Sequence, residues 1–146
     1  MKNLFDLSGK VAVVTGSSKG IGKSIASQMA LHGSNVVISS RNQESCDAVA
    51  SEINGSLPKG GGSALGIACH VSKRNDLENL VNTTKERLGN IDILVCNAAV
   101  NPFYGSMLEI SDTAYEKVLD SNVKSNHWLS QLVIPDMIEQ KDGVII

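Results

Sequence analysis

The regular alternation of short β-type runs with longer segments of helical periodicity is the feature that most constrains the fold of this chain of 146 residues. Strand-type runs occupy residues 10–15, 35–40, 64–69 and 91–96, and a further run begins at residue 143. Between these runs, apolar residues recur at helical spacing. The alternation predicts βαβ units with parallel strands, and right-handed crossovers place helices on both faces of a single sheet.

The helical segments are defined by their apolar stripes, which we expect to face the sheet. The expected buried positions are Ile21, Ile25, Ala26 and Met29 in the first segment, Cys46, Val49, Ala50 and Ile53 in the second, and Leu77, Leu80, Val81, Thr84 and Leu88 in the third. A long helix is expected over residues 111–140, with Ser111, Asp112 and Thr113 all suitable as its cap. Pro135 predicts a kink or an early end of that helix.

Composition and charge exclude several classes of protein. The formal net charge of −2 provides no excess of positive charge for a phosphate backbone, so nucleic acid is not an expected partner. The longest apolar runs have four residues, whereas a membrane span needs about 20. Asp6 interrupts the start before a signal-peptide core could form. We therefore expect a reducing, intracellular location, with the three cysteines as buried free thiols and no metal site.

The segment TGSSKGIG, residues 15–22, lies where the first strand turns into the first helix. Gly16 would make the turn, Gly20 would let a phosphate approach the backbone, and Gly22 would let the helix pack on the strand. The unpaired N–H groups of the following helix carry a partial positive charge of about half a unit, which suits a pyrophosphate. The alternative is an ordinary glycine-rich turn, because the spacing G-x3-G-x-G differs from the general dinucleotide fingerprint G-x-G-x-x-G.

The end of the second strand indicates which dinucleotide would bind. Sites that prefer NAD place an acidic residue there, but this strand ends in Ser39, Ser40 and Arg41. Arg41 could hold the extra 2′-phosphate of NADP, and Lys19 could supply a second cation. The alternative is that both cations are solvated surface residues. The sequence therefore predicts NADP(H) as the cofactor.

This altered glycine spacing resembles that of the short-chain dehydrogenase/reductase family. Asp92 in IDILV is followed by Asn97, Ala98 and Ala99, which resemble the NAG motif of the family, and Asn122 matches the catalytic asparagine. The segment over residues 97–105 also resembles the NADPH-dependent carbonyl and retinal reductases of the family. The resemblance implies an α/β fold, a Rossmann-type doubly wound parallel sheet in one domain over residues 1–146, and it implies that the chain ends within the fifth strand.

The resemblance also implies a set of site residues. Asn122 would be catalytic, and the cofactor-binding residues would be Gly16, Ser18, Lys19, Gly20, Ile21, Gly22, Ser40, Arg41, His70, Val71, Asn97, Ala98 and Ala99. Two positions depart from the family pattern. His70 replaces the aspartate that contacts adenine, although Val71 would still offer its backbone N–H, and Ala99 replaces a glycine. For Asn122 the alternative is a purely structural role as a polar residue that stabilises a helix kink.

In the complete enzyme the resemblance implies reversible reduction of a carbonyl, or oxidation of an alcohol, on a small-molecule substrate. The family uses a serine after the fifth strand and a Tyr-x-x-x-Lys pair. Four residues beyond the two tyrosines of this chain, Tyr104 and Tyr115, stand Leu108 and Leu119, so the pair is absent and we expect the chain alone to be inactive. A homo-oligomer in the cytoplasm or in peroxisomes is expected.

Two alternatives to an enzyme part remain open at this stage. The first is a non-catalytic nucleotide-binding or oligomerisation module, whose long helix would pair with a partner. The second is a flavodoxin-like receiver domain, although the early paired acidic residues of such domains are missing.

Overall fold

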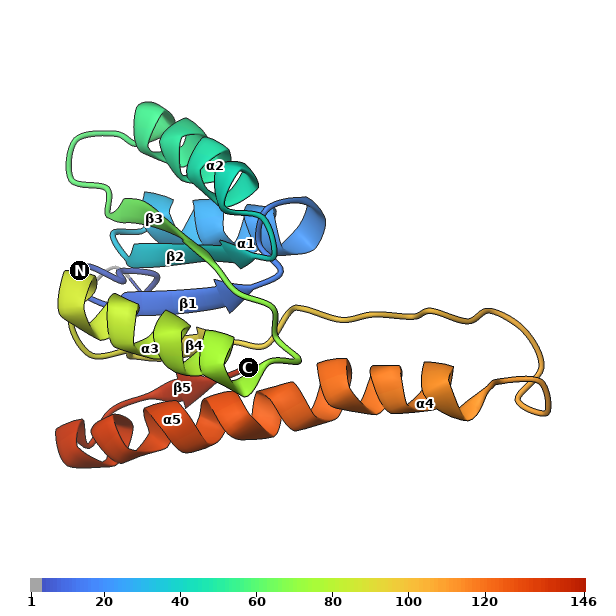
Figure 1. Ribbon diagram of the computed structural model, residues 1–146. Helices are drawn as coiled ribbons and strands as arrows, with labels where there is room; N and C mark the ends of the chain where they lie inside the picture. Colours follow the sequence, from blue (N-terminus) through green and yellow to red (C-terminus); the bar gives the residue numbers. More distant parts are fainter. Residues whose placement is uncertain (1–3) are drawn as a thin grey trace.

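The centre of the molecule is a parallel sheet of five strands in the order β3-β2-β1-β4-β5. The computed structural model describes residues 4–146, and Figure 1 shows the sheet between two layers of helices. The strands are β1 (Val11–Thr15), β2 (Asn35–Ser40), β3 (Ser63–Ala68), β4 (Ile93–Val95) and β5 (Val144–Ile145). The predicted doubly wound α/β fold is therefore confirmed.

The two faces of the sheet bury two separate apolar cores. The helices α1 (Gly20–Leu31) and α2 (Gln43–Ser56) cover one face, while α3 (Arg74–Leu88) and α5 (Ser125–Gln140) cover the other (Figure 1). Successive residues of β1 alternate between the cores, since Ala12 and Val14 face α1 and α2 whereas Val13 faces α3 and α5. All three are fully buried. This burial on both sides explains why the strands read as continuous apolar runs.

The first helix departs from the predicted stripe at Ile21, whose side chain is 76 % exposed. The residues of α1 that are buried against the sheet are Gly22, Ala26 and Ala30, spaced four apart. Their small side chains let the helix axis approach the strands closely. Ile21 lies about 100° around the helix from Gly22 and so points away from the core. The prediction that Ile21 is buried was wrong, whereas Ile25 and Met29 pack at the edge of the core.

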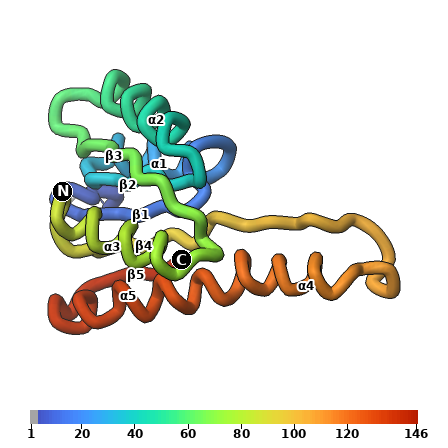
Figure 2. The backbone as a smooth tube through the Cα atoms, viewed as in Figure 1, coloured from blue at the N-terminus to red at the C-terminus, as the bar shows by residue number. Residues whose placement is uncertain are grey.

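Beyond β4 the chain leaves the body of the molecule and returns along one continuous helical rod (Figure 2). The rod consists of α4 (Asp112–Leu119), a π-helical turn η1 (Asp120–Lys124) and α5. Ser111 is its cap, because its hydroxyl accepts a hydrogen bond of 3.3 Å from the N–H of Ala114. The predicted early end at Pro135 was wrong, since α5 continues to Gln140. Pro135 is exposed, so water can replace the donor that proline lacks.

The edge strand β3 is covered by amide side chains of α2. Asn54 donates to the carbonyl of Ala64 at 2.9 Å and accepts from its N–H at 2.8 Å. Gln43 donates to the carbonyl of Gly66 at 3.0 Å and accepts from the N–H of Ala68 at 2.7 Å. These contacts occupy four outward-facing backbone groups that would otherwise be available for pairing with another chain.

Two further observations concern residues 4–146. No helix in this range combines the length and the apolar character that crossing a bilayer requires. All three cysteines are free thiols, as predicted, with Cys46 and Cys69 buried and Cys96 half-buried.

Candidate functional site

The loops that follow β1, β2, β3 and β4 meet at the carboxyl edge of the sheet, where parallel α/β sheets bind ligands. The N–H of Ser17 donates to the carbonyl of Ser39 at 2.9 Å, which joins the first two loops. The N–H of Cys69 donates to the carbonyl of Ser40 at 2.8 Å, which joins the second and third. The structure thus places the predicted residues of different loops beside one another.

The glycine-rich turn has the backbone that its sequence predicts. Gly16 and Gly20 have φ of +65° and +58°, a region that other residues adopt only at a cost. A Cβ on Gly20 would meet nothing within 4 Å, so this part of the backbone is open to a ligand. A Cβ on Gly22 would lie 2.5 Å from Nδ2 of Asn97 and 2.6 Å from the carbonyl oxygen of Gly16. Gly22 therefore serves close packing rather than contact with a ligand.

The remaining predicted residues of this turn lie toward its outer side. Ser18 is half-buried, while Lys19 and Ile21 are exposed. The N-terminus of α1 has no side-chain cap and no acidic residue in its first turn. By contrast, α2 and α4 are capped by Asn42 and Ser111. The first amides of α1 are therefore left to solvent or to an anionic ligand, which is the arrangement that suits a pyrophosphate.

Two buried hydroxyl residues hold the turn, and the sequence analysis did not single them out. The hydroxyl of Ser17 donates to the carbonyl of Val14 at 2.6 Å and accepts from the N–H of Ser39 at 2.8 Å. The hydroxyl of Thr15 accepts from the N–H of Ala98 at 3.0 Å. A signal for both was present, because Thr15 ends a fully buried strand and Ser17 lies just beyond it, and buried polar side chains need partners.

The NAA segment after β4 fastens the far side of the same turn. Nδ2 of Asn97 donates to the carbonyl oxygens of Thr15 and Gly16, at 2.9 and 3.1 Å. Ala98 packs closely on Gly16, since a Cβ added to Gly16 would lie only 2.9 Å from the Cα of Ala98. Ala99 is exposed beside them. Asn97 thus keeps the turn in place, and its amide nitrogen is already engaged.

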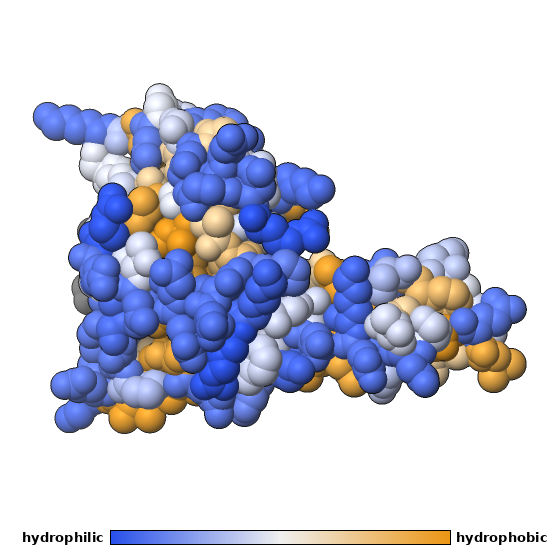
Figure 3. Space-filling view, viewed as in Figure 1, coloured by the Kyte–Doolittle hydropathy of each residue, from blue (hydrophilic) through white to orange (hydrophobic). Residues whose placement is uncertain are grey.

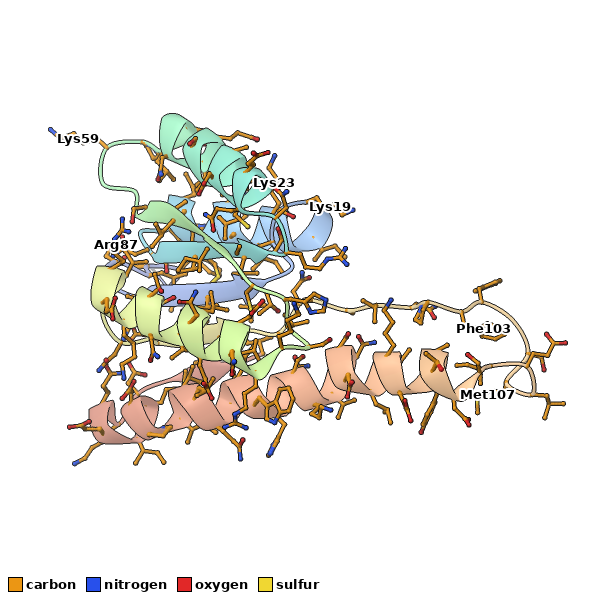
Figure 4. The ribbon with its side chains drawn as sticks, in the orientation of Figure 1. Lys19, Lys23, Lys59, Arg87, Phe103 and Met107 are labelled. Carbon is orange, nitrogen blue, oxygen red and sulfur yellow. The ribbon has the colours of Figure 1, made fainter. Side chains whose placement is uncertain are left out.

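The end of β2 presents Ser40 and Arg41 beside the glycine-rich turn, with Ser40 half-buried and Arg41 exposed. Figure 4 shows Lys19 and Lys23 at this end of the molecule, while Lys59 and Arg87 lie at the opposite end. Lys23 is paired with Glu52 at 2.7 Å. Within residues 4–146, neither Arg41 nor Lys19 forms an ion pair, and no acidic side chain ends β2. The electrostatic environment therefore favours an anion.

His70 and Val71 follow β3 at the same edge of the sheet, and both are half-buried. The N–H of His70 donates to the carboxylate of Asp76 at 2.9 Å. Its ring Nδ1 accepts from the N–H of Ser72 at 3.3 Å. With Nδ1 as the acceptor, the proton of the neutral ring is on Nε2. His70 therefore presents an N–H group where the family aspartate presents oxygen.

Asn122 lies in the π-helical turn, and its side chain holds the loop that follows β4. Oδ1 accepts from the N–H of Val100 at 2.8 Å, and Nδ2 donates to the carbonyl of the same residue at 3.0 Å. The neighbouring Ser121 shares a hydrogen bond of 2.8 Å with Ser72, which connects this turn to the loop after β3. Both polar ends of the Asn122 amide are thus used within the protein.

Two of the thiols near this edge, those of Cys69 and Cys96, are poor nucleophiles. Burial, assisted by the nearby Asp76 carboxylate and the Cys46 thiol, raises the pKa of Cys69 to about 12. Burial alone raises the pKa of Cys96. Neither thiol is ionised near neutral pH, so neither is activated as a nucleophile.

Comparison with known proteins agrees with this geometry. The family model described as short chain dehydrogenase matches residues 10–146. Human dehydrogenase/reductase SDR family member 4 is 42 % identical over 140 residues, which is 96 % of this chain and 49 % of that protein. The human mitochondrial family member 2 is 44 % identical with the same coverage. The chain spans about half the length of these curated relatives.

Solved structures show the same likeness. A short-chain type dehydrogenase/reductase from Mycobacterium marinum superposes with a TM-score of 0.87 at 36 % identity, covering 97 % of this chain and 54 % of that one. A metagenomic short-chain oxidoreductase, solved in complex with NADP, gives a TM-score of 0.86 at 34 % identity, covering 95 % and 61 %. Fold, motifs and relatives agree, and the chain belongs to the short-chain dehydrogenase/reductase family, whose members are oxidoreductases with nicotinamide cofactors.

Proposed function

We propose that this chain forms the NADP(H)-binding part of a short-chain oxidoreductase. The observation that carries the proposal is the pair Ser40–Arg41 at the end of β2, placed beside the glycine-rich turn by the hydrogen bond from Ser17 to Ser39. A 2′-phosphate carries close to two negative charges, and a guanidinium can bind it through paired, charge-assisted hydrogen bonds. Lys19 adds a second cation at the same end of the molecule (Figure 4).

The rest of the dinucleotide fits the groups at this edge. The uncapped N-terminus of α1 and the open backbone at Gly20 suit the pyrophosphate. The N–H of Val71 and the ring N–H of His70 are the groups available to the adenine. Ala98 and Ala99 border the ribose on the other side of the turn. When bound, the nicotinamide supplies or accepts the hydride.

The decisive experiment compares NADPH and NADH binding to Arg41→Asp. We expect NADPH affinity to fall about tenfold to hundredfold and NADH affinity to change little, because only the phosphate contacts are lost. Lys59→Asp is the matched control, since it makes the same charge change in an exposed loop at the opposite end (Figure 4). The assignment would be refuted if Arg41→Asp lost affinity for both cofactors equally. It would also be refuted if Lys59→Asp lost as much NADPH affinity as Arg41→Asp.

In the complete enzyme we propose reversible reduction of a carbonyl to an alcohol on a small-molecule substrate. The present sequence has no Tyr-x-x-x-Lys pair to donate the proton, and Asn122 is not acidic enough to do so. We therefore propose that this chain binds cofactor without turnover. Oxidation of NADPH by the chain, with a panel of aldehydes and ketones at rates typical of enzymes, would overturn this proposal.

We also propose self-association through the projecting rod. Within the described residues α4 has no buried side chain, and Tyr115, Leu119 and Val123 expose an apolar stripe at a spacing of four. Figure 3 shows apolar surface on this projection, and Figure 4 places Phe103 and Met107 on its outer loop. Replacing Tyr115 and Val123 by serine should lower the mass measured by light scattering, whereas an unchanged mass would contradict the proposal.

An intracellular location, cytoplasmic or peroxisomal, stays a prediction.

A further inference from the structure

We propose that Cys46 is a positioning residue for recognition of the 2′-phosphate. Its buried thiol hydrogen-bonds the Ser40 hydroxyl and thereby sets the direction in which that hydroxyl can donate. The proposal rests on the proposed function, because it assumes that the phosphate binds at the end of β2. It adds a residue from α2, outside the glycine-rich turn and outside the strand end, to the groups that determine cofactor preference.

The thiol and the hydroxyl are within hydrogen-bonding distance of each other. Oγ of Ser40 lies 3.2 Å from Sγ of Cys46, and either atom can be the donor. The same sulfur lies 3.8 Å from the carbonyl oxygen of Ser40 and 3.9 Å from that of Ile67. Cys46 is fully buried, whereas Ser40 is only half-buried. The thiol is therefore screened from solvent, while the residue whose hydroxyl it contacts keeps part of its surface exposed.

The hydrogen-bonding capacity of the pair explains how the thiol acts. The serine hydroxyl and the thiol each have one hydrogen to donate and can each accept. A phosphate has no hydrogen to offer at this contact, so the Ser40 O–H must turn toward it. The S–H of Cys46 can then donate to Ser40 Oγ and compensate for the bond that the hydroxyl gave up. No proton leaves either group; the two hydrogens only rotate.

A second acceptor makes this compensation necessary. Oγ of Ser40 also lies 3.5 Å from the carbonyl oxygen of Asn42, which competes for the hydroxyl hydrogen. When S–H donates to Oγ, the hydroxyl hydrogen is directed away from the sulfur and toward its other partners, of which a dianionic phosphate is the strongest. Without a donor at position 46, Ser40 Oγ accepts no such bond when its hydroxyl turns to the phosphate. Discrimination between NADP and NAD is expected to weaken.

The test uses the full chain with two probes that differ only in the phosphate, adenosine 2′,5′-bisphosphate and 5′-AMP, measured by calorimetry. We expect Cys46→Ala and Cys46→Val to lower the ratio of the two affinities about threefold to tenfold, the range that corresponds to one neutral hydrogen bond. Cys46→Ser retains a donor and should keep most of the ratio. Cys46→Val is the packing control, because it fills the core without a hydrogen bond.

The outcomes distinguish a purely structural role of Cys46 from a role in positioning the Ser40 hydroxyl. A purely structural role for Cys46 would change both affinities equally, so an unchanged ratio in Cys46→Ala and Cys46→Val overturns the inference. In a Ser40→Ala background, Cys46→Ala should have no further effect on the ratio, and an effect of the original size would also overturn it. If the unmodified chain itself fails to prefer the bisphosphate, the proposed function fails instead. Circular dichroism of each variant confirms that the compared proteins are folded.

Discussion

Replacing Asn122 by alanine tests whether this side chain holds the loop that follows β4. The substitution removes two hydrogen bonds, of 2.8 Å to the N–H of Val100 and of 3.0 Å to its carbonyl. Net contributions of about 0.5 to 1.5 kcal/mol per bond predict a loss of about 1 to 3 kcal/mol in the free energy of unfolding. For a domain of this size, that corresponds to a fall of roughly 2 to 12 °C in Tm.

Two further variants test whether the loss of stability comes from the two hydrogen bonds to Val100 or from the helix itself. Asn122→Asp can still accept from the N–H of Val100, but it places a second oxygen against the carbonyl, so it should also destabilise. Asn126→Ala is the matched control on the same rod, since its amide donates only locally, to the carbonyl of Asn122 at 3.0 Å. We expect the control to lose less than about 1 kcal/mol.

Urea unfolding followed by circular dichroism gives the free energies, and hydrogen exchange at the Val100 amide reports on the contact itself. Exchange at Val100 should accelerate in Asn122→Ala and stay unchanged in Asn126→Ala. If Asn122→Ala loses less than about 0.5 kcal/mol and leaves the Val100 exchange rate unchanged, then the side chain does not hold the loop after β4. The assignment of a positioning role to Asn122 would then be wrong.

Three further predictions concern packing, pH and the sheet edge. Gly22→Ala should cost about 1 to 3 kcal/mol of stability, because the added Cβ would lie 2.5 Å from Nδ2 of Asn97. Gly55→Ala in α2, whose Cβ would meet nothing within 4 Å, should gain about 0.5 to 1 kcal/mol. Shifts of Tm with the same sign in both variants would contradict this expectation. Burial raises the pKa of Cys69 from 9.0 to about 12, so the unfolded chain releases this proton first and stability falls as pH rises through that interval, by at most about 1.4 kcal/mol per pH unit. Cys69→Ala should flatten the fall of the unfolding free energy between those pH values, and an unchanged slope would count against the shift. Asn54→Ala removes both bonds to Ala64 and should speed exchange of the Ala64 amide on the order of fivefold; an unchanged rate would show that α2 does not protect this edge.

The strands and most helix faces could be predicted because burial on both sides of a parallel sheet leaves few alternatives. All four apolar residues expected in α2 are buried, as Cys46 and Ile53 illustrate. The error at Ile21 has a physical reason that periodicity does not contain. Gly22 must face the sheet so that α1 can approach the turn, and this requirement rotates the neighbouring isoleucine outward. Close backbone approach thus determined the helix face more strongly than hydrophobicity did.

The π-helical turn could not be predicted because its stabilising contacts are long-range. Asn122 bonds Val100, which is 22 residues away in sequence, and Ser121 bonds Ser72, which is 49 residues away. The helix propensity of the residues around position 122 contains no information on either of these contacts. Pro135 illustrates the opposite case, in which the helix continues past a strong local signal for ending it, at an exposed position where the carbonyl that proline cannot bond is accessible to solvent.

Long-range contacts also determine which atoms of a sequence motif remain available to a ligand. The spacing of Gly16, Gly20 and Gly22 predicts where a nucleotide would bind, but it does not say which atoms remain available there. The Asn97 amide nitrogen is occupied by two backbone carbonyls, whereas the backbone at Gly20 faces open space. A ligand competes least with the fold where a group is unsatisfied or, as at the half-buried Ser40, where a neighbouring donor can compensate for the bond that is given up. Contacts with the cofactor are therefore expected from backbone amides, exposed cations and the few side-chain donors that can still turn outward, such as the Ser40 hydroxyl, whereas the Asn97 side chain is expected to act by holding the turn in place.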